Sequence, residues 1–285
     1  PLRLEFTARE SLFFPPGKAA NTLRGALGTE FSRLAGPYAK LFAPVAPPGG
    51  PSGLADPPRP FVFRARHLDG RAIQPGESFH FDLNVFTIDT AVLEYFVRAF
   101  SALASEGLGP GRGKADLRCV RRLAAAGLPE QIICGAVDPV ALELDPRQSA
   151  PRTIRVEFLS PTELKHEDRI APRPEFPILF SRLRDRISIL RSLYGSGPLE
   201  LDFQASGLRA AAVKMTACEV RRIETERRST RTGQTHSIGG FVGMAEYEGD
   251  LAEFLPYLEV GRWTGVGRQS VWGKGEIRIA DDQLG

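Results

Sequence analysis

Hydrophobic and polar residues follow patterns that predict the same series of elements twice. At the start of the chain Leu2, Leu4 and Phe6 alternate with polar residues, and this period of two indicates a half-buried strand. Residues 19–35 carry apolar side chains at helical spacing, and so do residues 93–103. Residues 61–66, 79–86 and 117–123 have the composition of strands. The first half therefore predicts strand, helix, strand, strand, helix, strand, with a long Pro- and Gly-rich loop over residues 44–60.

The second half repeats this order. Strands are predicted at 154–158, 211–220, 241–247 and 275–279, and helices at 179–194 and 250–258. We therefore predict an α+β fold of two tandem ferredoxin-like (βαββαβ) domains with antiparallel sheets, spanning residues 1–148 and 149–285. The length of 285 residues suits two domains, because single domains mostly hold about 100–150 residues.

Composition narrows the function classes. The three cysteines are far apart and lack CxxC spacing, so no disulfide framework and no zinc site is indicated. We expect no metal, no cofactor and no membrane segment, and a cytoplasmic location. The net charge is +3, and most of the 37 basic residues are arginine. This excess suits phosphate recognition, although a GC-rich genome produces the same bias.

A glycine-rich run, Gly261–Gly275, combines several features of an RNA-binding segment. Its glycines alternate with Arg262, Arg268 and Lys274 and with the two tryptophans of the chain. Glycine lets backbone amides approach a phosphate, cations neutralise it, and an indole stacks on a base. The run follows a predicted helix and leads into a strand, which is the wrong context for a dinucleotide loop or a P-loop. A tight structural connection with buried tryptophan is the competing interpretation.

The stretch from Gly239 to Ile279, which includes GRWTGVGRQSVWGKGEI, resembles the C-terminal signature of the CRISPR-associated precursor-crRNA-processing endoribonucleases of the RAMP superfamily. Weaker similarities lie in LRGALG (23–28), PRPFVFR (58–64) and GLGPGRGK (107–114). The resemblance implies two ferredoxin-like domains, CRISPR repeat RNA or crRNA as partner, and cleavage without metal. In that cleavage a ribose 2′-hydroxyl attacks the adjacent phosphate, which leaves a 2′,3′-cyclic phosphate and a 5′-hydroxyl.

Such a reaction needs a base, an acid and cations that stabilise the transition state. Members of the family often carry a histidine in or near the first helix and another before a Val-Gly pair. Here residues 19–35 hold none, and Gly265 occupies the second position. His236, in a polar Arg-rich loop before the signature, is the leading catalytic candidate, and a solvated loop histidine is its alternative.

Two further residues are catalytic candidates. Arg24 lies on the polar side of the first helix and could stabilise charge, or could simply pair with a carboxylate on the surface. His67 lies in a turn before Asp69 and Gly70. His80 is expected at the surface, and His166 in a loop whose acidic neighbours would repel phosphate.

The candidate RNA-binding residues are basic side chains in or near glycine loops and in one crowded segment. They are Arg112, Lys114, Arg221, Arg222, Arg227, Arg228, Arg231, Arg262, Arg268 and Lys274. The helix 179–194 adds a further basic surface. The main alternative is a catalytically inactive RNA-binding subunit of a CRISPR effector complex, with other effector subunits as partners. A small-molecule enzyme on the same fold is not supported by any Ser/His/Asp set or phosphate loop.

Overall fold

A computed structural model describes residues 1–33, 44, 57–87, 89, 91–124, 127–132, 140–224, 226–228, 235–237 and 239–280. The chain forms two compact units. Unit 1 comprises Pro1–Ala141 together with Leu193–Ser196 and Val271–Gly273. Unit 2 comprises Leu142–Ser192, Gly197–Ser270 and Lys274–Gly285. The short segment Val271–Gly273 of the glycine-rich run is therefore a structural part of unit 1.

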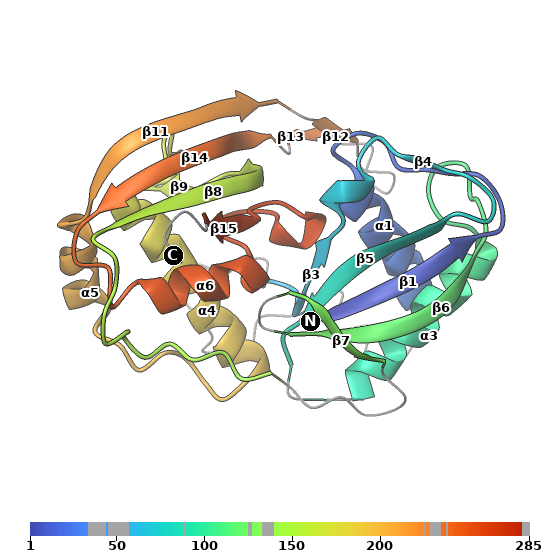
Figure 1. Cartoon of the computed structure of the whole chain (residues 1–285), viewed down its shortest axis with the longest axis horizontal. Coiled ribbons are helices and arrows are strands. Elements are labelled where there is room, and N and C mark those ends of the chain that lie inside the picture. The colour runs from blue at the N-terminus through green and yellow to red at the C-terminus, as the bar shows by residue number, and fades with distance from the viewer. Residues whose placement is uncertain are drawn as a thin grey trace. The chain divides into compact units, whose positions relative to one another are not determined.

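Unit 1 has the strand order of a ferredoxin-like fold. Its helices and strands are β1 (Leu2–Ala8), β2 (Leu12–Phe13), α1 (Ala19–Arg33), β3 (Phe61–Arg64), η1 (Arg66–Leu68), β4 (Ala72–Ile73), β5 (Ser78–Val85), α3 (Ala91–Glu106), β6 (Ala115–Leu123) and β7 (Pro129–Ile132). The main sheet is antiparallel in the order β3-β5-β1-β6-β7 (Figure 1). Strands β1, β3, β5 and β6 are strands 1 to 4 of the predicted motif. Read across the sheet from β6, these four lie in the order 4-1-3-2.

The core of unit 1 lies between one face of this sheet and the helices. Buried and half-buried residues alternate along β1, so that Leu4 and Phe6 point into the core. Leu23 of α1 and Phe100 of α3 are fully buried in the same core. Phenylalanine rings close it; Phe81, for example, lies 4.9 Å from Phe100 between ring centroids. The other face of the sheet carries polar side chains and no helix among the described residues of this unit.

Unit 2 repeats the topology. Its elements are β8 (Thr153–Thr162), β9 (Lys165–His166), β10 (Arg169–Ile170), α4 (Phe176–Tyr194), α5 (Phe203–Ala211), β11 (Lys214–Ile223), β12 (Glu226–Arg228), β13 (Thr235–Ser237), β14 (Gly240–Glu248), α6 (Leu255–Thr264), η2 (Ser270–Trp272) and β15 (Ile277–Ile279). The last two residues of α4, Leu193 and Tyr194, belong to unit 1, and so do Val271 and Trp272 of η2. The sheet order β11-β14-β8-β15 is again 4-1-3-2 read from β15 (Figure 1). The predicted fold class is confirmed in both halves.

Two predicted boundaries were wrong. Ala211 ends the unpredicted helix α5 and does not begin a strand. This short helix begins because the Asp202 carboxylate accepts a hydrogen bond from the Ala205 amide at 2.9 Å. The helix predicted at 250–258 runs instead over Leu255–Thr264, with Pro256 in its first turn. The first helix is described over Ala19–Arg33, and residues 34 and 35 of the predicted helix lie outside the described residues.

Candidate functional site

The glycine-rich run is only partly a loop. Its first four residues, Gly261–Thr264, complete helix α6, so the predicted loop begins at Gly265. Two of its glycines are required by the backbone. A Cβ on Gly275 would lie 1.9 Å from the Val266 carbonyl oxygen, and one on Gly267 would lie 2.3 Å from that of Glu163. Both residues also have positive φ, 66° and 78°. These glycines serve close backbone packing within unit 2.

The basic residues of the run differ in what they contact. Arg268 donates to the carboxylate of Glu163 at 2.6 Å, yet its side chain stays 55% exposed. Arg262 is exposed, with its guanidinium 5.2 Å from the ring centroid of Trp263. Lys274 is buried and presents little surface to a ligand. Of the three cations predicted to contact RNA, Arg262 and Arg268 are therefore accessible.

Arg24 and Trp272 come together in unit 1. Helix α1 is held at its start by Asp69, whose carboxylate accepts from the Ala19 amide at 2.8 Å. Arg24 lies one and a half turns further on, and its guanidinium carbon is 5.7 Å from the Trp272 ring centroid. Gly273 permits this approach, since a Cβ there would lie 2.5 Å from the Ala20 Cβ. The predicted catalytic candidate Arg24 thus lies beside an indole of the glycine-rich run.

His67 and His80 form a second pair in unit 1. Their ring centroids are 4.4 Å apart with planes at 26°, and His67 Nε2 lies 2.9 Å from the His80 carbonyl oxygen. Because a carbonyl only accepts, Nε2 must carry a proton. Burial, with smaller contributions from Arg3 and His67, lowers the pKa of His80. His80, expected at the surface, is half-buried.

The two pairs lie on opposite sides of the unit 1 sheet. Phe79 and Phe81 pack into the core, so His80 between them faces the other way. Helix α1 packs on the core side through Leu23. Arg24 belongs to the helical side, whereas His67 stacks on a residue of the opposite face. The two catalytic candidates predicted for unit 1, Arg24 and His67, therefore lie on different sides of its sheet.

A basic pair of strands in unit 2 forms a separate two-stranded sheet between β11 and β14 in the sequence. Strands β11 and β14 pair antiparallel up to Ile223 and Gly240, and β12 and β13 continue the chain between them as a second ladder (Figure 1). His236 pairs with Arg227 in this ladder. The structure describes only the backbones of Arg227, Arg228 and His236, and Arg231 lies outside the described residues. We call the segment 219–240 the basic hairpin.

The other predicted RNA-binding residues are exposed to different degrees. Arg221 is exposed and makes no ion pair with a described residue, whereas Arg222 pairs with Glu224. In the first glycine loop Lys114 lies 3.8 Å from Glu10, and Arg112 lies 3.9 Å from Glu106. Ion pairs this exposed contribute little to stability. Their cations remain accessible to an RNA phosphate.

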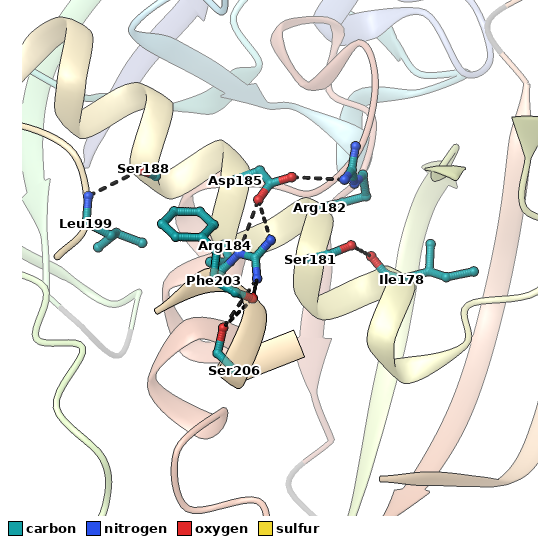
Figure 2. A network of polar contacts seen from close by, with 9 residues as sticks. All are labelled: Ile178, Ser181, Arg182, Arg184, Asp185, Ser188, Leu199, Phe203 and Ser206. Carbon is teal, nitrogen blue, oxygen red and sulfur yellow. Dashed lines mark hydrogen bonds and ion pairs between the residues drawn. The ribbon is translucent and has the colours of Figure 1, made fainter. Parts of the chain in front are cut away.

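Helix α4 is less basic at its surface than its sequence suggests. Arg184 is buried, with its side chain 9% exposed. Figure 2 shows its guanidinium donating to Asp185 and to the backbone oxygen of Phe203, beside Ser206. The Phe203 ring lies 4.3 Å from the guanidinium. Arg186 donates to the Thr264 carbonyl at the end of α6. These arginines join helices of unit 2, and the expected basic surface of this helix is smaller than predicted.

Two kinds of feature are absent from the described residues, a metal-binding cluster and a membrane-spanning helix. No group of three or more His, Cys, Asp and Glu side chains suited to a metal ion occurs among them. No helix in the described part of the chain combines the length and apolarity that a membrane crossing requires.

Three features of these surfaces could not be found in the sequence. The contact of Trp272 with Arg24 joins positions 248 residues apart, which no local pattern reveals. His80 and His67 come from a strand and a turn, and only the antiparallel pairing brings them together. Arg118, an exposed residue at a bulge in β6, was not considered.

Comparisons with known proteins agree with this description. Residues 156–277 match the family model described as CRISPR-associated endoribonuclease Cas6, and residues 1–143 match the model AF_1859_N, described as an N-terminal domain. The sequence matches none of the curated proteins with which it was compared.

Solved structures share the fold over nearly the whole chain. A product complex of Cas6 (TTHB231), a Thermus thermophilus protein, has a TM-score of 0.62 at 18% identity and covers 98% of each chain. A substrate mimic complex of Cas6 (TTHA0078) has a TM-score of 0.53 at 18% identity, with 98% of this chain and 99% of that chain covered. A Cas6-related protein from Pyrococcus furiosus has a TM-score of 0.52 at 11% identity, with 99% and 98% covered. Residues 156–277 are therefore similar to the Cas6 family of CRISPR-associated endoribonucleases, and the whole chain shares the fold of these solved structures.

Proposed function

We propose that this chain is an endoribonuclease that binds CRISPR repeat RNA and cleaves precursor crRNA without a metal ion. The match of residues 156–277 to the Cas6 endoribonuclease model carries the proposal. This region includes the whole basic hairpin and the whole glycine-rich run, the two segments richest in candidate RNA contacts.

We assign RNA binding to cations on both segments. On the basic hairpin these are Arg221 and Arg222, which are exposed, together with the sequence-predicted Arg227, Arg228 and Arg231; on the run they are Arg262 and Arg268. Arg112 and Lys114 add cations from unit 1. Arginine favours this role because its planar guanidinium donates two hydrogen bonds to one phosphate. Binding through several phosphates should weaken steeply as the salt concentration rises.

The cleavage step is in-line attack by a ribose 2′-oxygen on the adjacent phosphorus. The new O2′–P bond forms as the bond to the 5′-oxygen of the next nucleotide breaks, which yields a 2′,3′-cyclic phosphate and a 5′-hydroxyl. We assign charge stabilisation to Arg24, which the Trp272 indole flanks. An arginine stays protonated at neutral pH and cannot take the 2′-proton. His236 is the candidate for that proton transfer.

The mechanism is tested by incubating the protein in EDTA with its own repeat RNA and with a copy that carries one 2′-deoxy nucleotide before the cut. Cleavage of the ribose substrate alone, with a cyclic phosphate in the product, is the expected result. Cleavage of the deoxy copy would exclude attack by the 2′-hydroxyl. Loss of cleavage in EDTA that added Mg²⁺ restores would exclude the metal-independent reaction.

The residue assignments are tested by single-turnover rates at saturating protein. Arg24→Ala should slow cleavage about 10²-fold or more, as expected when a transition-state donor is removed. Arg24→Lys keeps the charge without the planar fork and should recover part of the rate. Arg98→Ala is the matched control, since Arg98 is 82% exposed on α3 of the same unit. An Arg24→Ala rate equal to that of the control would remove Arg24 from the mechanism, and an unchanged His236→Ala rate would remove His236.

A catalytically inactive RNA-binding subunit is the second candidate function. Helix α1 contains no histidine, and the described histidine pair lies on the side of the sheet away from Arg24. Tight binding of both substrates with no cleavage of either would establish this alternative. In that case Arg24→Ala should weaken binding and have no rate to change.

A further inference from the structure

The open face of the unit 1 sheet, away from α1 and α3, carries an ordered polar cluster that the proposed cleavage does not use. Three strands present one side chain each in a row, because His80 of β5 pairs with Glu5 of β1, and Glu5 pairs with Cys119 of β6. In the next row, the outward-facing residues Asp82 of β5 and Arg3 of β1 pair in the same way. His67 stacks on His80 at the edge of this cluster.

We propose that this face is a second RNA-binding surface, which takes one unpaired nucleotide with its base stacked on His67. The proposal rests on the proposed function, since it assumes that the protein binds RNA. It adds a site and a substrate class, single-stranded RNA, to the glycine-rich run and the basic hairpin.

The histidine pair has the geometry of a stacking platform. One face of the His67 ring rests on His80, and the hydrogen bond from Nε2 to the His80 carbonyl fixes the ring orientation. His67 is exposed, so its other face is accessible. The lowered pKa of His80 favours its neutral form, which avoids repulsion between two imidazolium rings. Because the His67 ring is already fixed, stacking of a nucleobase on it costs little side-chain conformational entropy.

The charges around the platform suit a phosphate. Both nearby carboxylates already have partners: Asp82 accepts two hydrogen bonds from Arg3, at 2.7 and 3.0 Å, and Glu5 accepts from Arg121 at 3.0 Å and from the Cys119 thiol at 3.1 Å. Pairing reduces their repulsion of an anion.

Arg118 supplies the cation. A β-bulge in β6 places an extra residue here, since Glu5 pairs with Cys119 whereas Phe6 pairs with Leu117. Arg118 is that extra residue; it is exposed and makes no hydrogen bond or ion pair with a described residue. Bulges often redirect a side chain at a functional site. Arg118 is therefore assigned to the phosphate of the stacked nucleotide.

The test uses a ten-nucleotide RNA without secondary structure that carries one 2-aminopurine, whose fluorescence falls when the base stacks. His67→Ala should weaken its binding about tenfold, because one stacked base is worth about 1–3 kcal/mol. His67→Phe keeps a flat ring and should retain most of the affinity and the fluorescence quenching. Arg118→Ala should weaken binding and reduce its salt dependence. His166→Ala is the matched control, an exposed histidine in unit 2.

Three outcomes for the His67→Ala variant would overturn the proposal. The variant could bind the RNA as tightly as the His166→Ala control, or it could still quench the 2-aminopurine fluorescence. It could also bind with unchanged affinity but cleave more slowly at saturation. The last result would place His67 in cleavage instead. Ultraviolet crosslinking of the wild-type protein to the same RNA tests the site without a substitution; a crosslink in residues 66–82 supports it, and crosslinks confined to unit 2 contradict it. If the wild-type protein binds neither this RNA nor its repeat RNA, the proposed function itself fails.

Discussion

The two units share one topology and both pack aromatic rings in their cores, but they differ in the polar contacts that link their elements. In both, the four main strands lie in the order 4-1-3-2. Unit 1 closes its core with stacked and edge-on phenylalanine rings, such as Phe6, Phe63 and Phe81. Unit 2 adds polar ties between its elements; Arg184 joins α4 to α5, and Ser160 accepts from the Glu276 amide beside β15.

This difference shows that one strand order tolerates a buried arginine between its helices in one unit and none there among the described residues of the other. Aromatic packing is non-directional. In unit 1 it covers one face of the sheet and leaves the other face open for the ligand site proposed at His67. Hydrogen bonds and ion pairs are directional, so they fix particular backbone segments. In unit 2 they hold the middle of the glycine-rich run, where Arg268 contacts Glu163. We expect substitutions to affect the units unequally.

The largest effect is expected from Phe81→Ala in unit 1. Phe81 is fully buried and contacts Phe6, Phe63 and Phe100. Loss of its ring should cost about 3–5 kcal/mol of unfolding free energy. Hydrogen exchange measured by mass spectrometry should show faster exchange in β1 and β5, with β8 and β14 unchanged. Equal acceleration in all four strands would show that the units unfold as one and would contradict independent cores.

Much of this architecture could be predicted from the sequence. The alternation in β1 and the helical stripe of α4 depend on local periodicity, which burial enforces directly. The sequence could not indicate that Arg184 is buried, because charged helix residues are usually solvated and its partners Phe203 and Ser206 lie on another helix. The stack of His67 on His80 likewise depends on strand pairing and η1. Contacts of this kind depend on residues far apart in the sequence, so local patterns could not indicate them.

Arg184→Ala is expected to have the next largest effect, in unit 2. The substitution removes a buried guanidinium that docks α5 (Figure 2). Asp185 keeps its contact with Arg182 at 2.9 Å, so the loss should be about 2–3 kcal/mol, below that for an unpaired buried charge. Urea denaturation measures it, with Arg182→Ala as the control at less than about 1 kcal/mol. Arg184→Ala no more destabilising than the control would mean that polar ties do not stabilise unit 2.

Two buried tyrosines allow a comparison of the units at high pH. Burial raises the pKa of Tyr247 in unit 2 far above its ordinary value, and raises that of Tyr194, counted in unit 1, to about 12. Since unfolded tyrosine ionises near pH 10, both groups stabilise the fold below that pH and lose this contribution as the pH rises above it.

Tyr247→Phe should cost about 1 kcal/mol at pH 8, because the Pro174 carbonyl loses its donor. The variant should lose less stability than wild type between pH 10 and 11. Tyr194→Phe should show the same change in smaller degree. Urea denaturation at pH 8, 10 and 11 measures both. A parallel fall in wild type and Tyr247→Phe would exclude Tyr247 as a source of alkaline instability.

The smallest expected effects come from one cross-strand ion pair on each of the two sheets. Arg3 and Asp82 pair across strands in unit 1 with side chains 21% and 17% exposed, and Arg278 and Glu157 pair across strands in unit 2 with 50% and 29% exposed. Solvent screens the second pair more, so a double-mutant cycle should give about 0.5 kcal/mol or less there, and about 1 kcal/mol for the first. In 1 M salt the second coupling should vanish and the first should persist in part. Equal couplings at both places would mean that the open face of unit 1 is no more ordered than that of unit 2, which would remove one support for a ligand site on it.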